Sequence, residues 1–344
     1  MRALRLLLLP FSLIYALIIR VRHLLFDTGI FSSTPGRLPA IVIGNLSVGG
    51  SGKTPFTLFL ARRLTNLGVK PAILSRGYRR TTTGFVLAGP DDHAASIGDE
   101  PSQMHRALPD IPLAVCENRL EGIRALANAS PAPEMVVLDD AFQHRALNAE
   151  LNILLTPYEK PWWKDFPLPA GDLRDIPYAR SRAHAIVVTR CPDPLPDSER
   201  KSLIAAIRPK TGQQVFFAGI RYGHPQSLEG EAIPYSRETP VIGFCGIASP
   251  APFESHLKAH FNLKSFRSFP DHHVFSPSEL RNLHAELATF ADPSAILVTT
   301  SKDAERIRQS ELPSNFRISH IPIETYLLGD DEAFNEMVKK ATVR

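Results

Sequence analysis

The chain has few cysteines, and their number and spacing exclude two kinds of stabilised protein. Three are present among 344 residues, Cys116, Cys191 and Cys245, and they lie far apart. An odd set at this spacing matches neither a disulfide framework nor the close pairs of a zinc site. It indicates a protein of a reducing compartment.

Neither sign of charge is in large excess, which argues against a nucleic-acid partner. The 39 basic and 35 acidic residues leave a net charge of +4, and no basic run is interleaved with aromatic residues. The sequence contains no internal repeat or low-complexity tract. Hydrophobic residues make up 44% and charged residues 22% of the chain, which is typical of a globular protein, and the length suits about two domains.

A long apolar run occurs only at the N-terminus. Residues 6–19 read LLLLPFSLIYALII, with Arg2 and Arg5 before them and Arg20 and Arg22 after them. As a helix this run would be about 21 Å long, against roughly 30 Å for the hydrocarbon core of a bilayer. Because arginines flank both ends, the charges favour no orientation across a membrane. We expect a helix that lies in one leaflet of a membrane surface, with burial in the protein core as the alternative.

Beyond residue 39, short apolar runs alternate with stretches of helical period. A helix is expected at 54–67, and strands are expected at 41–44, 72–75, 135–138, 151–155 and 185–189. Short β-rich runs separated by helices predict a parallel sheet covered by helices on both faces.

A second α/β pattern follows residues 192–240, a segment rich in proline and charge that contains a helix at 198–207 and is expected to hold the crossover between domains. Strands are expected at 241–245 and 295–299, and helices at 252–260 and 276–290. The predicted organisation is an N-terminal membrane-associated helix in residues 1–30, a main α/β domain in 31–225, and a smaller α/β domain in 226–344 that closes over the site.

A phosphate-binding loop is indicated by GNLSVGGSGKTP, residues 44–55, directly after the first expected strand. Glycine permits close approach of the backbone, so the N–H groups of this loop and of the next helix can point at a phosphate. Lys53 would reach the outer phosphates and the Thr54 hydroxyl would bind magnesium. The fold class is therefore P-loop NTPase-like α/β, and the predicted nucleotide-binding residues are Val48, Gly49, Gly50, Ser51, Gly52, Lys53, Thr54 and Pro55.

Two residues depart from the usual P-loop pattern. Ser47 stands where the pattern has its first glycine, and we expect the pair Gly49 and Gly50 to make the bend instead. Pro55 follows the lysine and threonine, in the first turn of the helix, where a missing N–H costs little. Both departures are compatible with a working loop.

A pair of acids follows the third expected strand, in EMVVLDDAFQHR at residues 134–145. The carboxyl end of a parallel strand beside a P-loop is where a carboxylate holds magnesium, directly or through water. Asp139 and Asp140 are thus predicted metal-binding residues. The alternative is that they cap a following helix.

Three further blocks carry charged groups that could meet at the same edge of the sheet. SRGYRR (75–80) offers arginines for an anionic substrate, or a solvated basic turn. GDEP (98–101) puts Asp99 and Glu100 in a loop bounded by glycine and proline. FPDHHVF (269–275) offers a histidine that could enter the site and pair with Asp99; a metal cluster of the Asp-His-His phosphoesterases and ordinary loop histidines are the alternatives.

Together with PLPAGDLRD and TTSKDAER, these blocks resemble the tetraacyldisaccharide 4'-kinase family, the lipid A 4'-kinases of Gram-negative bacteria. They occur in the family's order from residue 40 to 306, and the family shares the VGG-x-GKTP form of the loop. The resemblance implies transfer of the γ-phosphoryl group of ATP to the 4'-hydroxyl of a tetraacylated glucosamine disaccharide 1-phosphate, giving lipid IVA. It also implies peripheral or monotopic attachment to the cytoplasmic face of the bacterial inner membrane.

The resemblance assigns roles to residues of this chain. Asp99 would be the general base, oriented by His272, with Lys53 and Asp139 also in the catalytic set. Mg²⁺ would be held by Thr54, Glu100, Asp139 and Asp140, and Lys302 and Asp303 are expected to contact the nucleotide. The lipid head group would be bound by Arg76, Tyr78, Arg79, Gln143, His144 and Arg174. Ala141 and Asp175 stand where the resemblance leads us to expect glycine and glutamate.

Two other functions use the same loop chemistry. A nucleotide-driven switch, such as a metal-insertion chaperone, would hydrolyse its nucleotide without an acceptor and would have no use for an apolar N-terminus. A soluble small-molecule kinase or ligase would likewise not need it. Dependence of activity on detergent would separate these functions from a lipid kinase.

Overall fold

A nine-stranded sheet forms the centre of the larger domain in the computed structural model, which describes residues 5–290, 292–308 and 316–342. The strand order is β16-β10-β9-β8-β2-β6-β3-β5-β4, and only β4 and β16, at the two edges, are antiparallel to their neighbours. The strands are β2 Ala40–Asn45, β3 Pro71–Ser75, β4 Val86–Leu87, β5 Leu113–Val115, β6 Met135–Leu138, β8 Leu151–Pro157, β9 Ala185–Thr189, β10 Gln214–Tyr222 and β16 Ile323–Leu327. The predicted parallel sheet is confirmed.

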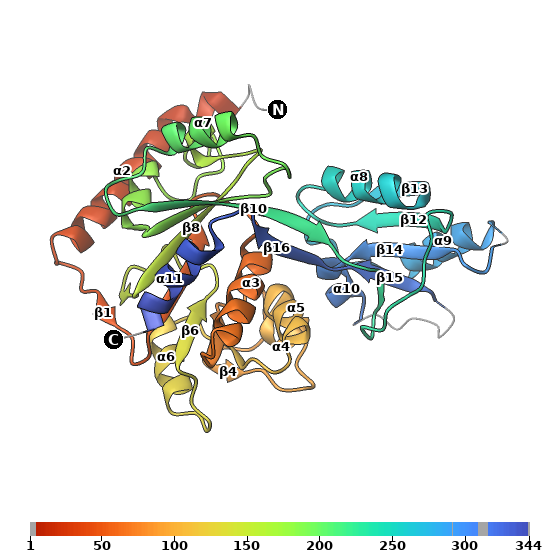
Figure 1. Cartoon of the computed structure of the whole chain (residues 1–344), viewed down its shortest axis with the longest axis horizontal. Helices are drawn as coiled ribbons and strands as arrows, with labels where there is room; N and C mark the ends of the chain where they lie inside the picture. Colours follow the sequence, from red (N-terminus) through yellow and green to blue (C-terminus); the bar gives the residue numbers. More distant parts are fainter. Residues whose placement is uncertain (1–4, 291, 309–315, 343–344) are drawn as a thin grey trace.

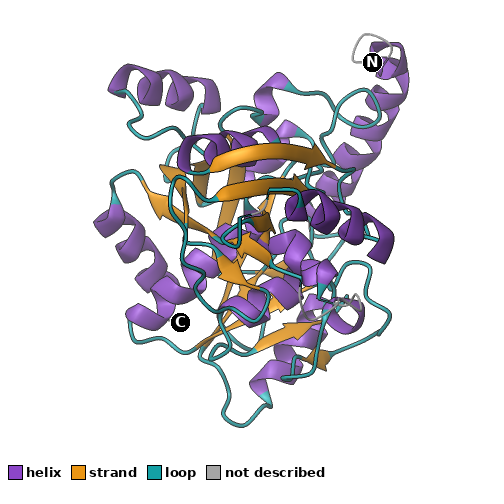
Figure 2. Cartoon of the chain, turned by 90° about the vertical axis from the view of Figure 1, so that its right-hand side faces the viewer, coloured by secondary structure: helices purple, strands orange, loops and turns teal. Residues whose placement is uncertain are grey.

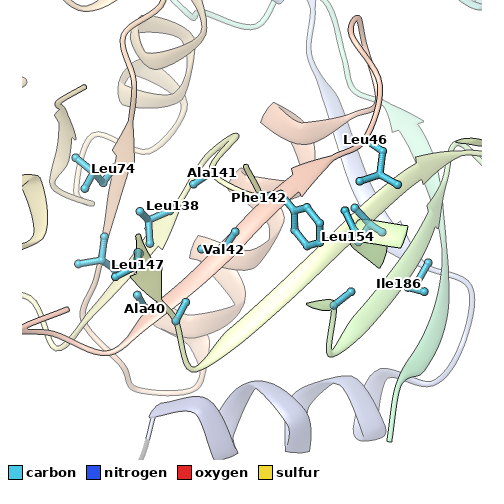
Figure 3. Packing of buried hydrophobic residues seen from close by; sticks show 14 of the residues in the cluster. Ala40, Val42, Leu46, Leu74, Leu138, Ala141, Phe142, Leu147, Leu154 and Ile186 are labelled. Atoms are coloured by element: carbon cyan, nitrogen blue, oxygen red, sulfur yellow. The ribbon is translucent and has the colours of Figure 1, made fainter. Parts of the chain in front are cut away.

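Helices cover both faces of this sheet because its central strands bury side chains on both sides. In β2, Ile41 and Ile43 pack with helix α3, whereas Ala40 and Val42 face the opposite cluster, which Figure 3 shows. This alternation is the two-residue period of a strand, and burial on both faces explains the continuous apolar run. The helices of this domain are α3 Lys53–Asn66, α4 Ala94–Ile97, α5 Asp99–Ala107, α6 Arg119–Ala127, α7 Asp197–Ile207 and α11 Asp331–Thr342.

The smaller domain contains a five-stranded sheet in the order β11-β15-β14-β12-β13. Its strands are β11 Gln226–Ser227, β12 Pro240–Cys245, β13 Asn262–Ser268, β14 Ile296–Thr300 and β15 Ile318–Ile321, and its helices are α8 Ala251–His260, α9 Pro277–Ala288 and α10 Ser301–Ile307. Figure 1 shows the antiparallel strands β10 and β16 crossing between the two sheets. After β15 the chain returns to the larger sheet as β16 and α11, so residues 323–342 pack with the main domain. The division at residue 226 stays a prediction.

The N-terminal helix is longer than the apolar run that predicts it. A 3₁₀ turn at Leu6–Leu8 continues into α2, Leu9–Asp27, and together they make a 22-residue helix with a mean hydropathy of 1.6 over its most apolar window. This length and composition are sufficient to cross a membrane. Figures 1 and 2 both place the helix at the outer margin of the larger domain.

Short elements complete the larger domain. Strand β1, Thr34–Pro35, pairs with β7, Leu147–Asn148, and 3₁₀ turns lie at η2, Trp162–Lys164, and η3, Pro177–Arg182. The indole of Trp162 is buried and meets that of Trp163 edge to face, with 5.0 Å between ring centroids. The tryptophan pair therefore belongs to the core of the domain.

Candidate active site

The loop between β2 and α3 has the backbone of a phosphate cradle. Its bend falls at Gly49 and its entry into α3 at Gly52, whose φ angles are 94° and 81°. Ser47 does not need a glycine conformation because it forms a β-bridge with Leu173, and Val48 N–H donates to Asp172 O at 2.7 Å. Residues 47 and 48 are thus fixed by backbone contacts with residues 172 and 173. Glycines occupy the two positions of positive φ in the loop.

Lys53, the first residue of α3, faces the end of its own strand and the acid pair. Its ammonium Nζ lies 3.3 Å from Asn45 Oδ1 and 3.8 Å from Asp140 Oδ1. The guanidinium of Arg174 donates to both Asp140 oxygens, at 3.0 Å from Nη1 to Oδ2, and to Asn45 Oδ1 at 2.7 Å. Two cations and one carboxylate therefore surround the mouth of the loop.

Asp139 and Asp140 are neighbours in sequence, but their pKa values are shifted in opposite directions. Burial, reinforced by the charges of Glu100 and Asp140, raises the pKa of Asp139 to about 7. Its oxygens accept from Thr57 Oγ1 at 3.2 Å and Ser75 Oγ at 3.3 Å. Burial also opposes ionisation of Asp140, but Lys53 and Arg174 outweigh it and lower the pKa of that carboxyl.

The donor set beside the loop fits a hard divalent cation shared with a nucleotide. Within the described residues, no three acidic or histidine side chains converge closely enough to hold a metal by themselves. Mg²⁺ in phosphoryl-transfer sites is bound by one or two carboxylates together with substrate phosphates. Thr54, Asp139 and Glu100 supply such oxygens, and the mutual repulsion that raises the pKa of Asp139 is the repulsion a cation would relieve.

Asp99 and Glu100 do not lie in a loop, as the bounding glycine and proline suggest, but begin helix α5. Gly98 has a φ of 97°, and α5 starts directly after it with both acids in the first turn. Pro101 is tolerated because it falls in that turn as well. The carboxylates are consequently fixed at a helix N-terminus, where negative charge is favourable.

The smaller domain brings His272 to Asp99, as expected from the sequence. His272 Nδ1 lies 3.5 Å from Asp99 Oδ2, and the residue has a φ of 63°. Burial lowers the pKa of His272, and Lys302 and Arg306 lower it further, against the opposing charge of Asp271 and the bond to Asp99. The surroundings of His272 therefore favour the neutral imidazole.

Arg306 is the member of this group that the sequence interpretation missed. Its Nε donates to Asp99 Oδ2 at 2.8 Å, and its Nη2 lies 3.0 Å from His272 Nδ1. Its Nη1 donates to Asp303 Oδ1 at 2.9 Å. A helical interpretation of SKDAER would have placed Lys302 and Arg306 four residues apart on one face.

Asp303 and Lys302, in the block TTSKDAER, have different surroundings. Asp303 is fully buried and accepts from Gly246 N at 3.0 Å and Thr300 Oγ1 at 2.7 Å, so it supports Arg306, and the expected contact with a nucleotide stays a prediction. Lys302 Nζ lies 3.7 Å from Glu100 Oε1 and 3.3 Å from His272 Nε2. Lys302 thus faces the same seam between the domains as Asp99.

Five of the six residues expected to bind the lipid head group fall into two sets, and the sixth, Arg174, lies beside the loop with Asp140 and Asn45. Arg76, Tyr78 and Arg79 follow β3 and are exposed, with Arg79 over the Tyr78 ring at 5.5 Å. Gln143 and His144 follow the acid pair and are half-buried, and Gln143 Nε2 donates to Asn45 O at 2.8 Å. The two sets lie after neighbouring strands, β3 and β6, at one edge of the sheet.

A buried arginine near these groups carried no sequence signal. Arg119, at the start of α6, is 4% exposed, and its Nη1 donates to Cys116 O and Glu117 O at 3.0 and 3.1 Å. Burial first, and then the positive charges of Arg119, Arg22 and Arg76, lower the pKa of His144 to about 4. Arg119 therefore adds to a field that favours anions at this edge of the sheet.

Helix α2 contacts the site through its polar side chains. Tyr15 donates its hydroxyl to Arg174 O at 2.9 Å, and His23 Nε2 lies 2.7 Å from Asp175 Oδ1. Asp175 keeps the carboxylate of the expected glutamate and uses it for this buried pair. The opposite side of the helix leaves a row of large apolar residues exposed: Leu6, Leu7, Leu8, Phe11, Leu13, Ile14, Leu17, Ile18, Val21 and Leu24.

A cradle between strand and helix, an acid pair on the adjacent strand and a second domain that contributes side chains define a P-loop nucleotide-binding α/β protein. The family model described as Tetraacyldisaccharide-1-P 4'-kinase (LpxK) matches residues 4–343. The chain belongs to this family.

Relatives of known name and structure agree with this assignment. The Tetraacyldisaccharide 4'-kinase of Flavobacterium johnsoniae is 37% identical over 340 residues, which are 97% of this chain and 96% of the relative. The protein of the same name from Bacteroides thetaiotaomicron is 38% identical over 346 residues, 96% and 91% of the two chains. A crystal structure of LpxK from Aquifex aeolicus, described as an "apo" form in complex with ATP, matches with a TM-score of 0.78 and 31% identity over 98% of this chain and 99% of that one.

Proposed function

We propose that this chain transfers the γ-phosphoryl group of ATP to the 4'-hydroxyl of a tetraacylated glucosamine disaccharide 1-phosphate, the lipid A precursor. Membership of the tetraacyldisaccharide 4'-kinase family supports the reaction. The observation that carries the mechanism is the 3.5 Å approach of His272 from the smaller domain to Asp99 from the larger one, at the edge of the sheet that bears the P-loop.

Asp99 is the general base in this proposal. It accepts the proton of the 4'-hydroxyl as that oxygen attacks the γ-phosphorus, while the bond to the bridging oxygen breaks and ADP leaves. Arg306 and His272 face Asp99 Oδ2, which leaves Oδ1 for the acceptor. A positioned base of this kind contributes roughly 10²–10⁴-fold in rate.

Charge on the phosphates is stabilised by the loop and its neighbours. Lys53 and the N–H groups that follow Gly49 hold the triphosphate, and Arg174 fixes Asp140 and Asn45 beside it. Mg²⁺, when bound with ATP, would neutralise phosphate charge, with Thr54, Glu100 and Asp139 as its oxygen donors and Asp140 beside them. Residues of both domains thereby surround the reacting phosphoryl group, and closure of the smaller domain limits hydrolysis by water.

The disaccharide 1-phosphate is anionic, and the edge after β3 and β6 is suited to it. Arg76 and Arg79 are exposed cations there, and guanidinium groups bind phosphate in a bidentate fashion. Tyr78, Gln143 and His144 add hydrogen-bonding groups for the sugar hydroxyls. We assign these residues to the lipid head group.

The exposed apolar row on α2 supports association of the enzyme with a membrane surface. A spanning helix would need to leave the protein, but the polar side chains Arg5, Tyr15 and His23 bind the helix to residues 169–175 along its length. The apolar row then faces away from the domain, as in a helix that lies in one leaflet. We infer peripheral or monotopic attachment to the cytoplasmic face of the bacterial inner membrane, where ATP and the lipid meet.

The reaction is tested by following labelled γ-phosphate from ATP in detergent micelles that contain a tetraacylated disaccharide 1-phosphate. The proposal expects label on the lipid and little hydrolysis of ATP when lipid is omitted. Equal hydrolysis with and without lipid, and unlabelled lipid, would instead favour a nucleotide-driven switch. Labelling of a water-soluble disaccharide as efficiently as of the lipid would point to a soluble small-molecule kinase.

A further inference from the structure

Arg190 is a cation beside the phosphate-binding loop that none of the roles above uses. It follows β9 directly, and its Nη2 lies 3.2 Å from the position that a Cβ on Gly50 would occupy, so the guanidinium packs on the loop backbone. The preceding residue, Thr189, donates its hydroxyl to Ser51 O at 2.9 Å. The same hydroxyl oxygen lies 3.6 Å from the position that a Cβ on Gly52 would occupy. The end of β9 therefore packs against the phosphate-binding loop.

The guanidinium of Arg190 has no hydrogen-bond or ion-pair partner within the part of the chain that the structure describes. None of the hydrogen bonds or ion pairs among residues 5–290, 292–308 and 316–342 involves its side chain. Burial lowers the pKa of Arg190, against the weaker opposing effects of Glu159 and Tyr222. A half-buried cation without a hydrogen-bond or ion-pair partner is unfavourable, which indicates a group that completes its contacts with a ligand.

The backbone at Arg190 is also in an uncommon conformation. Its φ is 58°, in the left-handed region that residues other than glycine, asparagine and aspartate rarely adopt. Such positions persist where the surroundings fix them, and they occur often at ligand sites. With the backbone in this conformation, the Arg190 side chain lies next to Gly50.

The order of strands shows which half of ATP would meet Arg190. In the sequence β9-β8-β2-β6-β3, the loop follows β2, the acids Asp139 and Asp140 follow β6, and the exposed arginines follow β3. The acceptor therefore approaches from the β6 and β3 side. Because phosphoryl transfer places the attacking and leaving oxygens roughly in line, ADP must extend to the opposite side, over β8 and β9.

We propose that Arg190 is a nucleotide-binding residue whose guanidinium plane stacks on the adenine ring of ATP. A planar, always charged group suits the face of an aromatic base, and among the described residues no hydrogen bond or ion pair holds this guanidinium in another orientation. The assignment rests on the proposed kinase function and adds to it the residue that holds the nucleoside.

Binding measurements without lipid test this assignment apart from the kinase reaction. The free energy of unfolding of the wild type and of Arg190→Ala would be measured at increasing concentrations of Mg·ADP and of Mg·tripolyphosphate, which has phosphates but no base. The rise of this free energy with ligand concentration gives the dissociation constant of each ligand. The dissociation constant for ADP should rise about 3- to 30-fold in the variant, the range of a cation–π contact, and that for tripolyphosphate should stay within twofold. Lys201→Ala, at an exposed site on α7, is the control for loss of a positive charge.

Steady-state kinetics supply the second measurement. Arg190→Ala should raise the KM for ATP by a similar factor and leave kcat with lipid within about twofold, with Arg190→Lys intermediate because lysine keeps the charge but not the plane. An equal loss for ADP and tripolyphosphate would show a phosphate contact and overturn the stacking, as would unchanged ADP binding. A wild type that binds ADP but labels no lipid would refute the kinase function without touching the assignment of Arg190.

Discussion

At the residue scale, the site depends on adjacent carboxyls that are given opposite properties. Asp139 is buried among other acids, which raises its pKa to about 7, whereas Lys53 and Arg174 keep Asp140 ionised. Pairs of acids whose pKa values are pushed apart commonly have separate tasks. Asp140 anchors the cations around the loop, and Asp139 is suited to the metal.

Arg174 should be sensitive even to a conservative change. Its two nitrogens bind Asp140 and Asn45 together, and a lysine at this position can supply the charge but not the fork. We expect both Arg174→Ala and Arg174→Lys to lose about tenfold or more in kcat/KM. Steady-state kinetics with lipid in micelles check this, and a lysine variant with full activity would show that only the charge matters.

His320 should make the stability of the protein depend on pH. Burial, then the charges of Arg308 and Arg106, lowers the pKa of this histidine to about 4, from about 6.5 in an unfolded chain. The unfolded state therefore binds the proton first, and the contribution of neutral His320 is present above pH 6.5 and lost as the pH falls toward 4. The loss amounts to about 3 kcal/mol at most.

Urea denaturation of the wild type and His320→Gln between pH 7 and pH 4.5 checks this expectation. The difference in free energy of unfolding should shift in favour of the variant as the pH falls, because glutamine does not titrate. Comparing the two proteins at each pH cancels the titration of other groups. A difference that stays constant over this range would contradict the assignment.

At the scale of elements, helix α2 has two faces with separate tasks. Its apolar row is exposed and its polar side chains hold residues 174–175, which contact the site. Changes on the apolar row should weaken membrane binding, about tenfold or more for each of Leu13→Ser and Leu17→Ser, because each removes an apolar side chain from the membrane. Sedimentation with vesicles of bacterial lipid composition measures this.

Tyr15→Phe is the matched variant on the polar face. It removes the hydroxyl that donates to Arg174 O and leaves the apolar row unchanged. Vesicle binding should stay at the wild-type level while kcat falls. Full activity in Tyr15→Phe, or wild-type vesicle binding by the serine variants, would show that the two faces do not have these tasks.

The sequence predicted local elements well because their signals are local. The strands that carry the loop and the acid pair were expected within a few residues of β2 and β6, since short apolar runs bounded by turn residues define them. The helix at Asp99 was not expected, because a glycine with positive φ and a proline in a first turn both resemble a loop. Strands β10 and β16 were also not expected, because their pairing joins segments about 100 residues apart.

At the scale of the whole molecule, the proposed active site lies where side chains of the two domains meet. Asp99 belongs to the larger domain, and His272 and Arg306 come from the smaller one, which β10 and β16 connect to it in Figure 1. The sequence could suggest Asp99 and His272 through the resemblance of their blocks. It could not identify Arg306, whose partners are set by how the two domains meet.

Because the side chains of His272 and His273 face different partners, we expect their replacement by alanine to affect activity differently. His272 contacts Asp99, whereas His273 faces away from it, with Nε2 3.1 Å from Glu279 at the start of α9. His272→Ala should lower kcat by about tenfold or more with little change in the KM for ATP. His273→Ala is the control and should keep kcat, since its contacts lie within the smaller domain. Equal rates in wild type and His272→Ala would remove His272 from its place beside the base.

The most direct test of the account is the role of Asp99 in phosphoryl transfer. Labelled γ-phosphate would be followed to the tetraacylated disaccharide 1-phosphate for the wild type, Asp99→Ala and Asp99→Asn, with binding of Mg·ADP measured in parallel. The account predicts that both variants bind ADP normally and lose roughly 10²–10⁴-fold in transfer, because each lacks a base for the 4'-hydroxyl. Transfer by Asp99→Asn at close to the wild-type rate would contradict it.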